Sequence, residues 1–118
     1  LWVDPEDGWS VRIIDQTRLP WALETPRLTT AEEVAHAIRA MLVRGAPLIG
    51  AAAAHGVALE MRADSSTVAL ERAVETLGRT RPTAINLGWA LGRMRAKLHN
   101  KAPADRVAAA YAEAKAIA

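Results

Sequence analysis

The sequence of 118 residues contains no cysteine, no phenylalanine and only one tyrosine. Without cysteine, the chain can form neither a disulfide framework nor a zinc site that uses thiolates. Four tryptophans are the other aromatic residues, so the hydrophobic half of the composition is largely aliphatic and rich in alanine. Alanine loses no side-chain entropy in a helix and lets helix backbones approach closely. The composition therefore predicts a core of closely packed helices.

An excess of one charge and a long apolar run are also lacking. The 15 basic and 13 acidic residues leave a formal charge of +2, and no basic run alternates with aromatic residues, so nucleic-acid binding is not expected. The longest apolar stretch, residues 46–59, contains His55 and is too short to span a bilayer. No cluster of histidine, aspartate and glutamate has the spacing of metal ligands. We expect a cytoplasmic chain without a membrane partner or a metal.

The first 26 residues carry the signals of a β-arm. Residues 4–8 have a strong turn composition, and residues 9–14 follow the period-2 pattern of a half-buried strand. A third short strand is expected around residues 21–25, at an edge of the sheet because Pro20 and Pro26 flank it. These signals predict a β-hairpin or meander.

From residue 29 onward the apolar period is helical. Thr30 and Glu33 match a capping box, and Gly45 is expected to end the first helix. Pro47 opens a second helix, to about Arg62, that is apolar on nearly every side and therefore expected at the centre of the bundle. Three more helices are expected over about residues 68–78, 84–98 and from 103 onward.

The sequence thus predicts a mainly α fold of the α+β type. A small N-terminal antiparallel β-arm over residues 1–26 precedes a bundle of about five helices over residues 27–118. Thr83 is expected to cap the fourth helix. The last helical run has no glycine or proline stop signal, so both parts together are expected to form the N-terminal domain of a longer protein.

Two tight turns share one construction, an arginine immediately before a helix. They lie at residues 44–47, Arg-Gly-Ala-Pro, and at residues 81–84, Arg-Pro-Thr-Ala. Unpaired N–H groups at a helix N-terminus favour phosphate, and arginine adds bidentate hydrogen bonds to its oxygens. At the first turn, Gly45 and Ala46 would let a ligand approach the backbone. Arginine before a helix-ending glycine and proline at a helix start are also ordinary structural features, so the pattern alone leaves both interpretations open.

The remaining polar residues favour structural roles. On its own, His55 in the alanine-rich helix is interpreted as a packed or edge histidine and not as a base. Asp15 and Gln16, directly after the apolar strand, are interpreted as turn residues. Asn86 is expected to hydrogen-bond a loop backbone from the first turn of its helix.

Three strings of residues point to a family. They are Trp-Ser-Val-Arg-Ile-Ile-Asp-Gln-Thr at 9–17, Val-Arg-Gly-Ala-Pro-Leu-Ile-Gly at 43–50 and Thr-Arg-Pro-Thr-Ala-Ile-Asn-Leu at 80–87. In this order and spacing, they resemble the methylthioribose-1-phosphate isomerases, and the resemblance extends across nearly the whole chain. The superfamily also contains ribose-1,5-bisphosphate isomerases and regulatory subunits of the translation initiation factor 2B complex. His55 departs from the pattern, because members of the family often carry an aromatic residue there.

The resemblance implies an aldose–ketose isomerisation in methionine salvage, from methylthioribose 1-phosphate to methylthioribulose 1-phosphate. It implies that Arg44, Gly45, Ala46 and Arg81 contact the substrate. It further implies a homodimer, no metal or other cofactor, and a Rossmann-like C-terminal domain that carries the catalytic cysteine and aspartate. That domain is missing from these 118 residues, so no catalytic residue is expected among them.

Two alternatives stay open. The substrate could be another pentose phosphate, such as ribose 1,5-bisphosphate or deoxyribose 1-phosphate. The chain could also be a non-catalytic regulatory domain like those of initiation factor 2B, which share this architecture.

Overall fold

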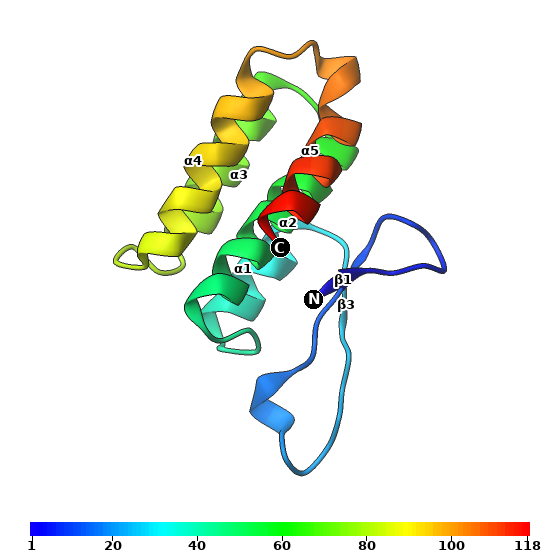
Figure 1. Cartoon of the computed structure of the whole chain (residues 1–118), viewed down its shortest axis with the longest axis vertical. Coiled ribbons are helices and arrows are strands. Elements are labelled where there is room, and N and C mark those ends of the chain that lie inside the picture. The colour runs from blue at the N-terminus through cyan, green and yellow to red at the C-terminus, as the bar shows by residue number, and fades with distance from the viewer.

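The computed structural model describes residues 1–118 and consists of a small sheet followed by five α-helices, which confirms the predicted fold class (Figure 1). The sheet and the turn after its second strand comprise β1 (Trp2–Val3), β2 (Val11–Arg12), the 3-10 helix η1 (Gln16–Arg18) and β3 (Arg27–Leu28). The helices are α1 (Ala31–Arg39), α2 (Ala46–Ala63), α3 (Thr67–Gly78), α4 (Ile85–His99) and α5 (Pro103–Ile117). None of them combines the length and hydropathy that crossing a membrane requires.

Helix α2 is the centre of the bundle, as its composition predicts. Every residue from Ile49 to Met61 is buried, and the helix packs against α1, α3, α4 and α5. Four consecutive alanines and two glycines supply little side-chain volume, so four neighbouring helices can approach one axis. The orientation of α2 therefore sets the orientation of the whole bundle.

Helices α2, α3, α4 and α5 alternate in direction. In Figure 1, α2 and α4 both run from the lower end of the bundle to its upper end, and α3 and α5 run back. The N-termini of α2 and α4 consequently lie at the same end of the molecule, which is also where α5 ends. This arrangement brings the two predicted anion-binding turns to one end of the bundle.

The β-arm is a three-stranded antiparallel sheet with β2 in the middle. Val11 pairs with Val3 on one side and with Leu28 on the other. The third strand was expected around residues 21–25, and this prediction was wrong, because β3 lies beyond Pro26. Pro26 has no N–H and cannot donate a hydrogen bond to a neighbouring strand. Arg27 has its own N–H, so it can take part in the hydrogen bonding of the sheet.

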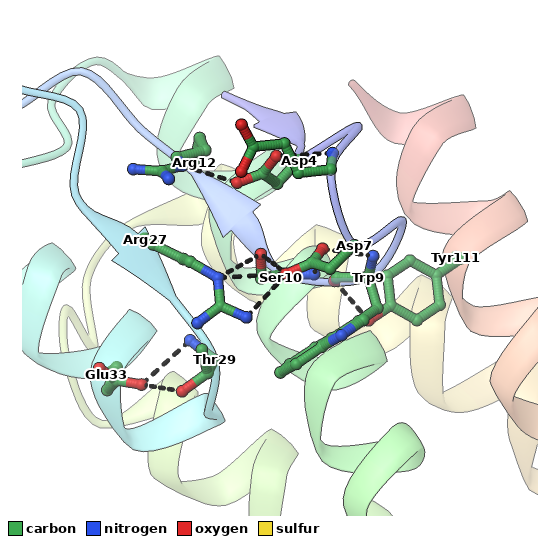
Figure 2. Close-up of polar contacts among 10 residues, drawn as sticks. Asp4, Asp7, Trp9, Ser10, Arg12, Arg27, Thr29, Glu33 and Tyr111 are labelled. Atoms are coloured by element: carbon green, nitrogen blue, oxygen red, sulfur yellow. Dashed lines mark hydrogen bonds and ion pairs between the residues drawn. The ribbon is translucent and has the colours of Figure 1, made fainter.

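Ion pairs and hydrogen bonds hold the arm together (Figure 2). The guanidinium of Arg27 donates to the Asp7 carboxylate at 2.7 Å and to Oγ of Ser10 at 3.0 Å. On the other side of β2, Arg12 donates to the carboxylate of Asp4 at 2.9 Å. A sheet with two residues in each strand is too small to be stable alone, so these side chains and the packing on the bundle stabilise it.

The arm is attached to the bundle through the buried side chains of Val11, Ile13 and Leu28, which belong to the hydrophobic core, and through polar contacts of Trp9 and Gln16. The hydroxyl of Tyr111 in α5 donates to the carbonyl of Trp9 at 2.7 Å, and the guanidinium of Arg62 lies 3.7 Å from the centre of the indole ring. Separately, the N–H of Gln16 donates to the carbonyl of Leu42 at 2.9 Å. The arm thus contacts the bundle at α2, at α5 and at the connection between α1 and α2.

Helix α1 begins largely as predicted but ends earlier. Oγ1 of Thr30 accepts from the N–H of Glu33 at 3.0 Å, and the Glu33 carboxylate reaches back to the N–H of Thr29. The expectation that Gly45 ends this helix was wrong, because α1 ends at Arg39 and Met41 takes the left-handed conformation, with φ of 63°. Residues 40–45 therefore form a separate connection.

Candidate functional site

The N-termini of α2 and α4 have no side-chain cap. The N-cap residues are Gly45 and Ala84, and neither can offer a side-chain oxygen to the first turn. In contrast, α1 and α3 are capped by the hydroxyls of Thr30 and Ser66. The N-terminus of α5, after Ala102, lacks a side-chain cap as well. The first N–H groups of a helix have no partner within the helix, so the uncapped starts of α2 and α4 present free donors and the positive end of the helix dipole.

The prediction that Thr83 caps α4 was wrong. The N–H of Ala84 donates to the carbonyl of Arg81 at 3.0 Å, which closes a turn over residues 81–84 and makes Ala84 the N-cap. The side chain of Thr83 therefore lines a cavity next to the helix end. The missing cap leaves the N–H groups of α4 available to a ligand.

The two helix ends lie close together because of Gly50. A Cβ atom at this position would lie only 3.0 Å from the carbonyl oxygen of Asn86 and 3.5 Å from Cβ of Ala90. Real Cβ atoms rarely approach a backbone oxygen so closely, so glycine is what permits the contact between α2 and α4 here. The contact lies near both helix starts, because Gly50 is the fifth residue of α2 and Asn86 and Ala90 are the second and sixth residues of α4.

A cavity of about 480 Å³ lies between these helix ends. Arg81 lines it, and the guanidinium nitrogen Nε of this residue is buried without any hydrogen-bond partner. A buried donor without a partner is costly, and Nε of Arg81 is the one buried side-chain atom in this condition. Because this nitrogen has almost no accessible surface, an anionic oxygen in the cavity would satisfy it only after the side chain turns toward the ligand. The lining residues are Ala46, Ile49, Arg81, Thr83, Ala84, Ile85 and Asn86.

The structure brings two of the four residues named by the resemblance into this cavity. Ala46, the first residue of α2, and Arg81 line it together. Gly45 and Arg44 precede Ala46 and are exposed, and neither lines the cavity. Gly45 has φ of 93° and ψ of 133°, a conformation that side chains disfavour, so glycine is required to turn the chain into α2.

Asn86 and Thr83 are cavity residues to which sequence reasoning gave purely structural roles. Asn86 was expected to hydrogen-bond a loop backbone, but its side chain makes no hydrogen bond in the structure and lines the cavity. The signal was present in the string that follows Arg81, in which Thr83 and Asn86 are the only polar side chains up to residue 88. Neutral donors and acceptors beside an arginine suit the hydroxyl groups of a sugar.

A larger cavity, of about 570 Å³, lies elsewhere, beside the N-terminal strand and α5. His55 lines it, is 4% exposed, and lies 2.8 Å through Nδ1 from the carbonyl of Ala51. Burial lowers the pKa of the imidazole. The interpretation of His55 as a packed histidine is therefore confirmed. The two cavities share no lining residue, and His55 does not line the α2–α4 cavity.

The chemistry of the α2–α4 cavity is that of binding. Arg81 is the one titratable side chain that lines it, and the other polar side chains are a hydroxyl and an amide. The guanidinium and the free N–H groups can hold and orient an anion, because both donors and the helix dipoles favour negative charge. The fold and the cavity together define a class of protein: a helical domain with a cavity whose geometry is suited to binding an anion.

The comparisons with known proteins agree with this class and identify the family to which the chain belongs. The chain belongs to the initiation factor 2 subunit family, whose model matches residues 42–117. It is 69% identical over 117 residues to the methylthioribose-1-phosphate isomerase of Acidiphilium cryptum (strain JF-5), with 99% of this chain and 32% of the relative covered. The corresponding enzyme of Rhodospirillum centenum (strain ATCC 51521 / SW) is 60% identical over 118 residues, with 100% and 31% covered. The chain therefore spans about a third of the length of the curated relatives it matches.

Two solved structures resemble the chain equally well. The crystal structure of 5-methylthioribose 1-phosphate isomerase from Pyrococcus horikoshii OT3 matches with a TM-score of 0.86 at 38% identity, covering 94% of this chain and 34% of that one. The translation initiation factor eIF-2B, subunit delta, from A. fulgidus also matches with 0.86, at 34% identity, covering 98% and 35%. An enzyme and an initiation factor thus share this fold.

Proposed function

We propose that the chain supplies the phosphate-binding part of a methylthioribose-1-phosphate isomerase, which converts its substrate to methylthioribulose 1-phosphate in methionine salvage. The single observation that carries the proposal is the buried, unpaired Nε of Arg81 beside the uncapped start of α2 at Ala46. The names and identities of the relatives supply the substrate. Arg44, Gly45, Ala46 and Arg81 are the proposed substrate-binding residues.

The reaction explains why such a site is needed. A phosphate on the anomeric oxygen prevents the sugar ring from opening as a free aldose does, so the phosphate must stay bound while hydrogen moves between C1 and C2. Holding the phosphate fixes the reacting carbons relative to the groups that act on them and lowers the entropic part of the barrier. Arg81 and the N–H groups of Ala46 and Gly45 would bind phosphate oxygens, and Thr83 and Asn86 would face sugar hydroxyls.

The test uses Arg81→Gln with a matched control. Charge-assisted hydrogen bonds contribute about 1.5–3 kcal/mol, so the variant should bind inorganic phosphate about 10- to 100-fold more weakly in calorimetric titration. Arg79→Gln removes an arginine two residues away that is exposed and paired with Glu75, and it should bind like the wild type. Isomerase assays on the native gene product should show the same contrast, with Arg44→Ala also losing most activity. Full activity in Arg81→Gln would contradict the assignment.

A second candidate function is a non-catalytic regulatory domain. The observation that favours it is the match to the initiation factor subunit, which is as close in structure as the match to the isomerase. Assaying the native gene product on methylthioribose 1-phosphate, ribose 1,5-bisphosphate and deoxyribose 1-phosphate separates the possibilities. Turnover of the first substrate supports the proposal, faster turnover of another pentose phosphate revises the substrate, and no turnover of any favours the regulatory function.

We further propose that residues 1–26 together with strand β3 form the arm, and the residues after β3 the bundle, of one domain. We also propose that the protein is a cytoplasmic homodimer. The division follows the change from alternating to helical periodicity, and the other two properties rest on the resemblance to the isomerase family. Light scattering on the native gene product tests the dimer, since a monomeric mass would contradict it, and cell fractionation tests the location.

A further inference from the structure

The connection between α1 and α2, residues 40–45, carries Arg44 and Gly45 of the proposed site but has little regular structure. At its start, the N–H groups of Leu42 and Val43 both donate to the carbonyl of Ala37, and Met41 takes a left-handed conformation that non-glycine residues seldom adopt. The side chain of Val43 is fully buried. These contacts hold the first half of the connection to α1.

One hydrogen bond ties this connection to a different part of the molecule. The N–H of Gln16 in η1 donates to the carbonyl of Leu42 at 2.9 Å, two residues before Arg44. The peptide plane that carries this carbonyl leads directly into Val43 and Arg44, so its orientation affects the path of the chain to Gly45. The backbone of the arm therefore contacts the connection that carries Arg44 and Gly45 of the proposed site.

The side chain of Asp15 determines where this N–H points. Asp15 is 6% exposed, and its carboxylate accepts from the N–H of Thr17 at 2.9 Å and from the Thr17 hydroxyl at 2.5 Å. The N–H of Asp15 donates to the carbonyl of Glu24 at 2.9 Å, which closes the loop around η1. The carboxylate thus fixes the short helix from which Gln16 reaches Leu42.

We propose that Asp15 is a positioning residue of the phosphate site. It touches no substrate, and it acts by holding the Gln16 N–H against the Leu42 carbonyl, which sets the geometry of the N–H groups of Gly45 and Ala46. The inference rests on the proposed function for its ligand. The geometric part of the inference concerns the connection alone and is tested separately.

The first experiment compares Asp15→Ala with Asp64→Ala. Asp64 caps a turn in the same way, through the N–H of Ser66, but it lies at the opposite end of α2. Asp15→Ala should lower the affinity for inorganic phosphate about 3- to 10-fold, the effect of one hydrogen bond, and shift the amide resonances of Gly45 and Ala46. Asp64→Ala should do neither. Equal losses in the two variants would overturn the proposal, because they would show an effect of global stability.

Two further variants separate the mechanism from folding. Asp15→Asn keeps an acceptor oxygen for Thr17 and should restore both affinity and amide resonances; failure to restore them would overturn a mechanism based on that acceptor. Gln16→Pro removes the N–H donor itself and should reproduce the effects of Asp15→Ala. Proline suits the first position of a short helix, and Asp15 already has the extended conformation, with ψ of 101°, that a following proline favours.

The readouts distinguish this inference from the proposed function. Wild-type protein that does not bind phosphate would contradict the proposed function, and the amide resonances of Gly45 and Ala46 would still test the positioning. Phosphate binding by the wild type, with unchanged affinity and unchanged resonances in Asp15→Ala and Gln16→Pro, would overturn the positioning role and leave the proposed function in place.

Discussion

At the scale of single residues, His55 couples the stability of the fold to pH. Burial lowers the pKa of its imidazole below the ordinary value of 6.5, so the unfolded chain binds a proton that the folded chain does not. The free energy of unfolding should therefore fall as the pH drops below about 6.5, with a slope approaching about 1.4 kcal/mol per pH unit. The carboxylates with lowered pKa values act in the same direction but only below their ordinary pKa values, which are 4.5 for Glu33 and 3.8 for Asp4, Asp7 and Asp64.

The prediction is that His55→Phe removes this dependence. Urea denaturation of the variant between pH 7 and pH 5 should give a nearly constant free energy of unfolding, because phenylalanine does not titrate. His36→Gln, which changes an exposed histidine on α1, is the control and should keep the slope of the wild type. An unchanged slope in His55→Phe would show that another group is responsible.

Arg106 is a buried cation that has no carboxylate partner. It is 3% exposed, and its guanidinium donates to the carbonyls of Leu98 and Ser65 at 3.0 and 2.8 Å. Further donors reach the carbonyl of His99 and the hydroxyl of Thr67. The charge is stabilised by the negative end of α4 and ties that end to the connection between α2 and α3.

Arg106→Met should therefore lower the free energy of unfolding by about 2–4 kcal/mol, since it leaves several carbonyl groups without a donor. Arg95→Met is a control of the same size change, because Arg95 is exposed and pairs only with Glu71, and it should cost less than about 1 kcal/mol. Equal midpoints for the two variants in urea would show that the carbonyls find other donors.

Single residues also show which local features could be predicted from the sequence and which could not. The cap at Thr30 was predictable because a hydroxyl at the N-cap is a strong local signal. The end of α1 was not, because Met41 adopts a conformation that normally requires glycine or asparagine, and Gly45 offered the more obvious signal. Of the candidate site, the positions of the two turns followed from the sequence. The shared cavity depends on the distance in space between the starts of α2 and α4, which lie 39 positions apart in the chain, at Ala46 and Ile85.

At the scale of elements, the contact between α2 and α4 is the feature on which the cavity depends. Gly50→Ala would place a methyl group against the Asn86 carbonyl oxygen, and backbone cannot move aside as a side chain can. We expect a net loss of about 1–3 kcal/mol in the free energy of unfolding, together with weaker phosphate binding, because the helix ends must separate.

Gly92→Ala is the matched variant on α4. An added Cβ there meets nothing within 4 Å, and the position is exposed, so the higher helix propensity of alanine should raise the free energy of unfolding by about 0.5–1 kcal/mol. Thermal denaturation and phosphate titration of both variants give the comparison. A stabilised Gly50→Ala with normal affinity would show that the two helices shift without consequence for the cavity.

The helices themselves were predictable at this scale, and the third strand was not. A helix of twelve or more residues repeats its apolar period several times, so the pattern can be recognised in a single sequence. Strand β3 has two residues and shows no period, and the prolines at 20 and 26 suggested a strand between them. Its actual place after Pro26 depends on pairing with β2, which lies 15 residues earlier and cannot be read from local sequence.

At the scale of the whole molecule, the arm should open independently of the bundle. Its polar links to the helices are three: the Tyr111 hydroxyl on the Trp9 carbonyl, the Arg62 guanidinium on the Trp9 ring, and the Gln16 N–H on the Leu42 carbonyl. The side chains of Val11, Ile13 and Leu28 add apolar contacts with the core. Terminal segments with few hydrogen bonds to the rest of the fold open locally at a lower free energy than its central helices.

Tyr111→Phe removes one of these links and keeps the ring. Hydrogen exchange of the arm amides at Val11 and Ile13 should become about 3- to 10-fold faster, the effect of one hydrogen bond, whereas the amides of α2 should exchange as before. Faster exchange in α2 as well would mean that arm and bundle unfold as one unit.

The burial of α2 on every side has a consequence for how this family can change. The helix that begins at the cavity is also the helix against which all the others pack, so a substitution that retunes ligand affinity from within α2 also disturbs the core. In a comprehensive mutational library, the substitutions in α2 that weaken ligand binding should therefore also be those that lower the stability of the fold. On the outer face of α4, Ile85 and Trp89 are 85% and 56% exposed, so substitutions there should be able to change binding without lowering stability. New specificities should arise more readily from α4 and the turn before it than from the helix with the greater number of neighbours.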